Sequence, residues 1–302
     1  MTLVRRSSAL LFLLGSALLC GACVAPFPAL PDSGEPGTWS TSFAHGGVNR
    51  EAVVYIPESW SPDTATPMLL NFHGYGGTAV DHMEEADFRP VADAEGFVLV
   101  MPQGSLLQGS PHWNSAAPSD DNKSAVDDFG FVELLLDTVG ASVSIDAERV
   151  YAVGYSNGGM MSFGLACHRS GLVAAVGSVS GAMLDDIGVA CTPGPTSVIT
   201  LHGTADTVLR YEGGDGMRSA AGVVDYWRGI NQITDEPTES TTSEAGTTVE
   251  SFVHAGGTGG TEVHHHRVVD GGHVWLDVNI EGADTNRLLW NFFSRFGRDG
   301  AL

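Results

Sequence analysis

Short apolar runs alternate with longer amphipathic stretches along most of the chain. The apolar runs, each bounded by turn-forming residues, predict strands at Ala52–Ile56, Met68–Phe72, Phe97–Met101, Val150–Val153, Ala174–Val179, Ser197–Leu201 and Val263–Val269. The amphipathic stretches predict helices at Asp87–Ala94, Asp128–Val139, Gly158–His168, Met217–Asn231 and Asp284–Phe296. Continuous apolar strands that alternate with helices are typical of an α/β fold, in which helices cover both faces of a mostly parallel central sheet.

The N-terminal end of the chain has the pattern of an export signal. Arg5 and Arg6 precede the apolar stretch Ala9–Leu19, and small residues follow it. A signal peptide explains this order, and a lipid anchor on Cys23 is an alternative that stays open. We therefore expect a secreted protein or a surface or periplasmic lipoprotein. The expected organisation is a signal peptide at 1–22, a Pro-rich tether at 23–40 and an α/β domain at 41–302.

Charge and composition narrow the range of functions. The 302 residues carry 14 Lys and Arg against 36 Asp and Glu, a net charge of −22, and 43% of them are hydrophobic. So large an apolar content excludes a disordered chain. An acidic chain is also unsuited to nucleic acid, because phosphate binding needs clustered cations. The polar stretch Thr234–Thr261 is expected to be a surface excursion around the strand Val249–Val253.

Cys167 and Cys191 are the two cysteines that lie outside the N-terminal segment. An even pair in an exported chain favours a disulfide over two separate buried thiols. On the chain-entropy model, such a bridge would stabilise the fold by roughly 3 kcal/mol.

The segment Val150–Met161 contains a Gly-x-Ser-x-Gly motif centred on Ser156. In a chain with 39 glycines the motif alone carries little weight. Its context carries more, because a predicted buried strand precedes it and an amphipathic helix follows it. A strand, a sharp turn and a helix form the nucleophile elbow, which presents the serine hydroxyl above the edge of the sheet. Ser156 is therefore the candidate nucleophile.

A nucleophilic serine needs a base, and the base needs a carboxylate that orients it. Asp206 follows the strand Ser197–Leu201, and His273 follows the strand Val263–Val269. The order serine, acid, histidine is the one expected for this type of elbow. We predict Asp206 as the acid and His273 as the base. Lower-ranked alternatives are Asp185, Asp186 and Asp270 for the acid and His202 for the base.

The Gly-rich segment His73–Gly77 follows the predicted strand Met68–Phe72 and resembles an oxyanion loop of the His-Gly-Gly-Gly type. Its glycines would let backbone N–H groups approach the oxygen of a tetrahedral intermediate. We predict that the backbone N–H groups of Tyr75 and Asn157 are the two donors of the oxyanion hole.

Three aromatic residues are candidates for substrate contact. Flat rings stack on aryl groups and sugars, so Trp113, Tyr155 and Trp275 are predicted to line the site, with partial core burial as the alternative. Metal binding is not expected. Consecutive residues of a strand point to opposite faces, which argues against a zinc site at His264–His266. The acidic run Asp120–Asp128 lacks the turn glycine of a calcium loop. The sequence therefore predicts no metal and no cofactor.

Several of these segments together resemble a known family. They are His73-Gly74, Val126–Phe131, Val150–Met161, His202–Asp206 and Gly272–Trp275. In combination they resemble the secreted poly(3-hydroxybutyrate) depolymerase-like esterases, which include the feruloyl and acetylxylan esterases of carbohydrate esterase family 1. The resemblance implies an α/β-hydrolase fold with Ser156, Asp206 and His273 as the triad, the same assignment that the order of motifs gives.

The expected function is therefore that of a secreted serine carboxylesterase. Its expected substrates are feruloyl or acetyl esters of plant polysaccharide, or related small esters. A polyhydroxyalkanoate depolymerase is the main alternative, and a peptidase and a non-catalytic surface scaffold remain open. The expected partner is the ester substrate and no nucleic acid, while the sequence leaves the oligomeric state undecided.

Overall fold

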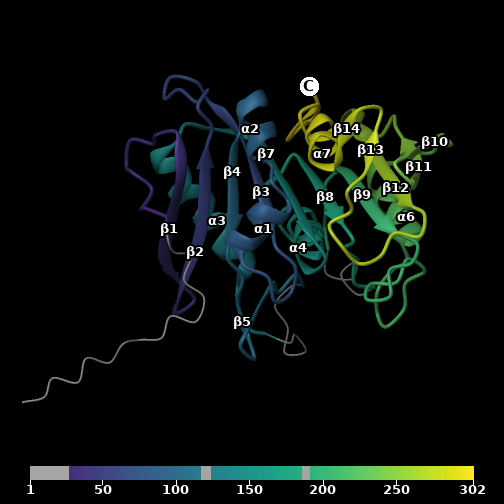
Figure 1. Ribbon diagram of the computed structural model, residues 1–302, viewed down its shortest axis with the longest axis horizontal. Helices are drawn as coiled ribbons and strands as arrows, with labels where there is room; N and C mark the ends of the chain where they lie inside the picture. Colours follow the sequence, from purple (N-terminus) through teal and green to yellow (C-terminus); the bar gives the residue numbers. More distant parts are fainter. Residues whose placement is uncertain (1–26, 117–123, 186–190) are drawn as a thin grey trace, which may run out of the picture.

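The computed structural model describes residues 27–116, 124–185 and 191–302 of the chain. A ten-stranded sheet runs through the molecule in the order β1-β2-β4-β3-β7-β8-β9-β12-β11-β10, and helices lie on either side of it (Figure 1). The central strands, from β4 through β3, β7, β8 and β9 to β12, are parallel to one another. The outer pairs at both edges are antiparallel. The predicted α/β fold with a mostly parallel sheet is therefore confirmed.

In sheet order the strands are β1 (Gly37–His45), β2 (Val48–Ile56), β4 (Val98–Pro102), β3 (Thr66–Phe72), β7 (Ile145–Tyr155), β8 (Ala175–Val179), β9 (Ser197–Gly203), β12 (Val263–Val268), β11 (Thr247–His254) and β10 (Thr238–Glu244). Short two-stranded ribbons join β5 (Ser105–Leu107) to β6 (Ser110–His112), β13 (Asn279–Ile280) to β14 (Ala283–Asp284), and β15 (Phe296–Gly297) to β16 (Gly300–Ala301). The helices are α1 (Ala79–Glu85), α2 (Arg89–Glu95), α3 (Asp128–Ser142), α4 (Asn157–His168), α6 (Ala220–Asn231) and α7 (Thr285–Phe293), with a 3₁₀ turn at Thr258–Gly260.

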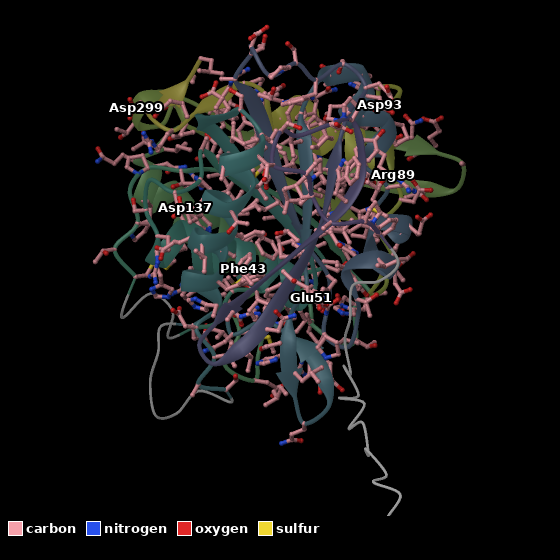
Figure 2. The ribbon with its side chains drawn as sticks, turned by 90° about the vertical axis from the view of Figure 1, so that its left-hand side faces the viewer. Phe43, Glu51, Arg89, Asp93, Asp137 and Asp299 are labelled. Atoms are coloured by element: carbon pink, nitrogen blue, oxygen red, sulfur yellow. A yellow bond between two sulfur atoms is a disulfide. The ribbon has the colours of Figure 1, made fainter. Side chains whose placement is uncertain are left out.

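Alternate residues of the central strands face two separate hydrophobic layers. Leu70 lies in the layer formed with α3, α4 and α6, whereas its neighbour Leu69 lies in the layer formed with α1, α2 and α7. Figure 2 views the molecule from the β1 side and places Asp93 of α2 and Asp137 of α3 on opposite sides of the strands. Because both faces are covered, β3, β4, β8 and β9 are buried at every residue. This double burial explains the uninterrupted apolar runs in the sequence.

Helices α1, α3, α6 and α7 each follow a residue whose side chain accepts a hydrogen bond from the first turn. The carboxylate of Asp127 accepts from the N–H of Gly130 at the start of α3, and Ser219 and Asp284 play the same part for α6 and α7. Helix α2 ends at Gly96, whose φ of 74° is left-handed and therefore favours glycine. Within the described ranges, no helix is long and apolar enough to cross a bilayer.

The stretch Thr234–Thr261 differs from its expectation. It does contain the predicted strand, here β11, but β11 pairs with β12 on one side and with β10 on the other. The segment lies at the surface, as expected, but it is a hairpin that extends the central sheet. Every residue of β10 except one is exposed. An exposed strand on this edge shows no alternation of apolar and polar residues, which is why the sequence pattern did not indicate it.

The folded domain begins before residue 41, where the sequence placed the boundary between the tether and the domain. Gly37–Ser40, assigned to the tether, belong to β1 and pair with β2 in register. Even before β1, the N–H of Leu30 donates to the carbonyl of Ser40 at 2.8 Å. The folded domain thus includes residues before 41. The expected signal peptide at 1–22 and the candidate lipid site Cys23 lie outside the described residues.

The predicted disulfide is present. Cys167, at the end of α4, is bonded to Cys191, which precedes β9. The two Cα atoms are 5.0 Å apart, a separation that a disulfide spans readily. The bridge ties α4, the helix that follows Ser156, to the segment that leads into β9, and Asp206 lies in the turn after that strand.

Replacing both cysteines with alanine is expected to lower the free energy of unfolding by about 3 kcal/mol, because the bridge closes a loop of 24 residues. Urea unfolding of the double variant, compared with the wild type with and without reductant, measures this loss. Reduced wild type should match the double variant. Equal stability of the oxidised wild type and the variant would contradict the expectation.

Candidate active site

Ser156 lies at the sharp turn between β7 and α4, with φ 53° and ψ −118°. A non-glycine residue with positive φ is strained, and such strain gathers at functional sites. The two glycines of the motif make the turn possible. A Cβ atom on Gly158 would lie 2.0 Å from the carbonyl oxygen of Phe72, and one on Gly154 would lie 2.3 Å from the backbone of Gly158. The Gly-x-Ser-x-Gly pattern is therefore dictated by the close approach of three backbone segments.

The structure brings the three predicted triad residues together. His273 Nε2 lies 2.9 Å from Ser156 Oγ, and His273 Nδ1 lies 2.7 Å from Asp206 Oδ2. Since the carboxylate can only accept, Nδ1 carries the proton and Nε2 is free to accept from the serine hydroxyl. Ser156 and Asp206 are buried, with 9% and 4% of their surface exposed.

The carboxylate of Asp206 is surrounded by hydrogen-bond donors. Its Oδ1 accepts from the backbone N–H groups of Val208 and Leu209 at 2.8 and 2.9 Å. Its Oδ2 faces His273 Nδ1 at 2.7 Å and His202 Nε2 at 3.4 Å. Burial raises the pKa of Asp206, but the hydrogen bonds from His202, His273, Leu209 and Val208 outweigh burial, and the pKa lies well below its ordinary value. The group is therefore an anion at any pH near neutrality.

Two side chains hold the backbone of the loop that carries His273. The hydroxyl of Tyr155 donates to the carbonyl of His273 at 2.8 Å, and Ser180 Oγ donates to the carbonyl of Val274 at 2.8 Å. The ring of Tyr155 also contacts the imidazole of His273, with centroids 5.3 Å apart. The hydroxyl of Tyr155 is thus bonded within the protein, while the predicted contact of its half-buried ring with substrate stays a prediction. Its place beside Ser156 in the motif lets it reach this loop.

The two predicted oxyanion donors belong to two segments next to Ser156, the loop His73–Gly77 and the start of α4. Gly74 lies directly against it, because a Cβ atom at Gly74 would come within 3.4 Å of the Ser156 Cβ. In that loop the N–H groups of Gly76 and Gly77 donate to Pro111 and Gly74. The Tyr75 N–H has no acceptor among the described residues. The Asn157 N–H lies in the first turn of α4, where helix N–H groups lack intrahelical acceptors. Both groups are thus free to bind an oxyanion.

His73 fixes the peptide group that carries the Tyr75 N–H. Its Nε2 accepts from the N–H of Gly104 at 2.9 Å, so its Nδ1 carries the proton and donates to the carbonyl of Gly74 at 2.7 Å. The Gly74 carbonyl and the Tyr75 N–H belong to one planar peptide, so fixing one orients the other. Burial lowers the pKa of His73 to about 4, which keeps the ring neutral.

Trp113 belongs to the interior and not to a substrate surface. Only 2% of it is exposed, and its indole N–H donates to the carbonyl of His73 at 2.9 Å. The Asn157 side chain accepts from the N–H of Trp113 at 2.7 Å and donates to its carbonyl at 3.0 Å. Trp113 is therefore an interior residue, contrary to the prediction that it lines the substrate site, and it joins the loop His73–Gly77 to the start of α4.

The third aromatic candidate, Trp275, is half-buried. Its ring packs edge-on against His82 and Phe88, with centroids 5.4 and 6.2 Å away. It lies two residues after His273, and part of its surface stays accessible. Trp275 and Tyr155 are both half-buried, so for these two of the three aromatic residues contact with substrate stays a prediction.

A buried ion pair that lies next to the Trp113 segment was not indicated by the sequence. Arg50 Nη2 donates to Asp128 Oδ1 at 2.6 Å, and both side chains are fully buried. Asp128 Oδ2 accepts from the N–H of Asn114 at 2.7 Å, which fixes the residue next to Trp113. The sequence pattern suggested only that Asp128 starts a helix. Its partner is distant in sequence, so only the tertiary fold identifies the pair.

The other candidates for acid and base take different positions. Asp185 and Asp270 are exposed, while the histidine that they would have to orient is already hydrogen-bonded to Asp206. Asp186 lies outside the described residues. His202 lies beside Asp206 and makes no hydrogen bond to Ser156. In the described part of the chain, no group of three His, Cys, Asp or Glu residues is arranged to hold a metal ion.

Comparison with known proteins places the chain in an esterase family. Residues 45–195 match the model of a family described as "Putative esterase". The chain is 29% identical over 166 residues to a bifunctional acetylxylan esterase/xylanase of Neocallimastix patriciarum, a match that covers 55% of this chain and 23% of that protein. It is 24% identical over 259 residues to feruloyl esterase B of Piromyces equi, which covers 82% of this chain and 45% of that protein. The chain thus spans less than half the length of these two relatives.

A solved structure shares the fold. The acetyl xylan esterase from Aspergillus awamori superposes with a TM-score of 0.64 at 16% identity, over 84% of this chain and 98% of that one. This likeness confirms the predicted α/β-hydrolase fold. Feruloyl and acetylxylan esterases are thus among the similar proteins, whereas these comparisons give the polyhydroxybutyrate part of the resemblance no support.

Proposed function

The chain belongs to this esterase family and is a carboxylic ester hydrolase, and from that premise we propose that it acts through Ser156, His273 and Asp206. The observation that carries the proposal is the chain of contacts from Ser156 Oγ to His273 Nε2 at 2.9 Å and from His273 Nδ1 to Asp206 at 2.7 Å. A nucleophile, a base and an orienting acid arranged in this way are the parts of an acyl-transfer triad.

In the proposed reaction, Ser156 Oγ attacks the ester carbonyl while His273 Nε2 takes its proton. The oxyanion that forms accepts hydrogen bonds from the backbone N–H groups of Tyr75 and Asn157. His273 then donates the proton to the leaving alcohol, and an acyl-enzyme on Ser156 remains. Water, deprotonated by His273, hydrolyses this ester and releases the acid. Asp206 stays ionised throughout and stabilises the imidazolium.

The proposed substrates are feruloyl or acetyl esters of plant polysaccharide, or small esters of the same acids. The names of the similar esterases support this class. Release from the cell is proposed with it, because a polysaccharide substrate lies outside the cell and the N-terminal pattern is that of an export signal.

The surface around Ser156 favours an apolar acyl group over acetyl. Tyr75, Val208 and Val274 are 59%, 62% and 52% exposed. Tyr75 carries one of the proposed oxyanion N–H groups. Val208 lies two residues after Asp206, and Val274 follows His273 directly. Exposed apolar side chains gathered at a site mark a surface that binds apolar ligand. A hydroxycinnamoyl ring offers such side chains an apolar surface, whereas an acetyl group offers only a methyl group.

Replacing Tyr75 with alanine is expected to raise KM for methyl ferulate by about fivefold to tenfold. Contact with about 50 Å² of the ring corresponds to about 1 kcal/mol at roughly 25 cal/mol per Å². The KM for ethyl acetate should change less than twofold, since the backbone N–H is kept. Val48→Ala, which removes an exposed apolar side chain on β2, is the control and should change neither value. Equal effects of Tyr75→Ala on both esters would contradict the preference.

A substrate panel together with an active-site probe tests the function as a whole. Wild-type protein should react with a fluorophosphonate and hydrolyse methyl ferulate faster than hydroxybutyrate oligomers or aminoacyl amides. Acetylated xylan in the same panel separates acetyl from feruloyl specificity. A protein that neither reacts with the probe nor turns over any ester would be a binding scaffold, and the proposed mechanism would be wrong.

A further inference from the structure

His202 is a second imidazole on the carboxylate of Asp206. It lies near the end of β9, where it pairs with Arg267 of β12, and it is 4% exposed. Its Nε2 lies 2.7 Å from the carbonyl oxygen of Leu209 and 3.4 Å from Asp206 Oδ2. Both of these oxygens are acceptors, so Nε2 must carry a proton that the two share.

The groups around His202 hold the ring in this orientation. The ring of Tyr211 packs edge-on against it, with centroids 5.7 Å apart. The Tyr211 hydroxyl lies 2.7 Å from His265 Nε2, and His265 Nδ1 lies 2.7 Å from Thr200 Oγ1. Besides Asp206 and His273, the titratable and charged groups nearest this cluster are Tyr211, His265 and Arg267, whose guanidinium lies over the Tyr211 ring and is paired with Glu250. Glu212 acts electrostatically on Tyr211, and His254 and His266 act on His265.

We propose that His202 is a positioning residue for the reaction, which fixes both the carboxylate of Asp206 and the turn that follows it. Its N–H group lies against Oδ2 and therefore offsets part of the negative charge that Asp206 presents to His273. Through Leu209 it anchors the turn whose N–H groups hold Oδ1. His202 touches neither substrate nor Ser156, so it acts only through Asp206. This inference rests on the proposed role of Asp206.

Two effects follow from removing the Nε2 donor. The turn at Leu209 loses an anchor, so Asp206 is held less firmly and kcat falls. The carboxylate also loses a donor on Oδ2 while its backbone donors on Oδ1 remain. It then presents more negative charge to His273 and favours the imidazolium, which cannot accept a proton from Ser156. The acid limb of the kcat/KM profile therefore moves to higher pH.

The variants His202→Asn and His202→Gln distinguish the effect of the hydrogen-bond donor from the effect of side-chain packing. The amide of glutamine reaches about as far as Nε2, whereas that of asparagine is one methylene shorter. His202→Asn is expected to lower kcat roughly tenfold or more with KM nearly unchanged, and to move the acid limb to higher pH. His202→Gln should restore most of kcat and return the limb towards wild type. His266→Gln is the matched control. That residue is a buried histidine on β12 bonded to Ser251, and its loss should lower Tm while leaving the limb in place.

Defined outcomes would overturn the proposal. A folded His202→Asn variant with kcat within twofold of wild type and an unmoved acid limb would do so, as would equal losses in the Asn and Gln variants. Should the variants fail to fold, histidine ¹⁵N spectra of the wild type decide, because a proton on His202 Nδ1 in place of Nε2 is incompatible with the proposal. If Asp206→Asn also left kcat unchanged, the proposed triad itself would be at fault.

Discussion

Ser156→Ala is expected to lower kcat for p-nitrophenyl acetate by about 10⁴-fold to 10⁶-fold, the range found when the nucleophile of such a triad is removed. The hydroxyl is the only group of the elbow that can form the acyl-enzyme. The oxyanion N–H groups and the base remain, and they account for the residual rate. The thermal midpoint should stay nearly unchanged, because alanine fits the same turn and removes no core contact.

Steady-state rates, fluorophosphonate labelling and thermal unfolding of the same preparation measure this result. Ser240→Ala, on the exposed strand β10, is the control and should keep wild-type activity and labelling. Hydrolysis by Ser156→Ala at a rate close to wild type would remove Ser156 from the mechanism. A large fall in Tm would instead mean that the loss of activity reports unfolding.

Asp206→Asn is expected to lower kcat by about 10⁴-fold, because it forces His273 into the wrong tautomer. Oδ1 accepts two backbone N–H groups, so the amide oxygen of asparagine must take that place. The amide nitrogen then faces His273 Nδ1. Since the amide nitrogen is a donor, Nδ1 keeps the hydrogen bond only if it loses its own proton and accepts. The proton moves to Nε2, and the ring can no longer take the proton of Ser156. An Asp206→Asn variant with wild-type kcat would exclude Asp206 as the orienting acid.

The same substitution should change how stability depends on pH. The pKa of Asp206 is lower in the folded protein than in the unfolded chain. The carboxylate therefore stabilises the fold above its unfolded pKa of about 3.9, and this contribution is lost as the pH falls towards the folded pKa. As the pH falls through that acid range, the free energy of unfolding of the wild type, measured with urea, should fall more steeply than that of Asp206→Asn. Parallel curves would show that the buried carboxylate does not contribute in this way.

Elements and residues could be predicted from the sequence where burial or backbone geometry allows only one type of residue. The central strands are buried on both faces, so their apolar runs could be recognised without knowledge of their partners. Ser156 could be located because Gly154 and Gly158 leave no room for a Cβ atom. Asp206 and His273 could be placed because each follows a parallel strand, and the carboxyl ends of parallel strands meet at one edge.

Roles that depend on tertiary contacts could not be predicted. Nothing local indicates that the hydroxyl of Tyr155 reaches the carbonyl of His273, or that the indole of Trp113 reaches His73. Both residues were expected to face the substrate because aromatic residues near a nucleophile often do so. Helix α1 was missed because its buried residues are Ala79, His82 and Met83, and this set gives only a weak apolar signal. The burial of Asp128 depends on Arg50, a partner 78 positions away.

The outermost strand has a consequence for the protein in solution. An unpaired strand offers its free N–H and C=O groups to any other extended chain, and apolar edges of this kind seed aggregates. Here β10 has the sequence Thr-Glu-Ser-Thr-Thr-Ser-Glu, and nearly all of it is exposed. Its carboxylates would face those of a second copy in a chain whose net charge is −22. The β10 edge of the sheet is thereby protected against pairing with the same strand of a second copy.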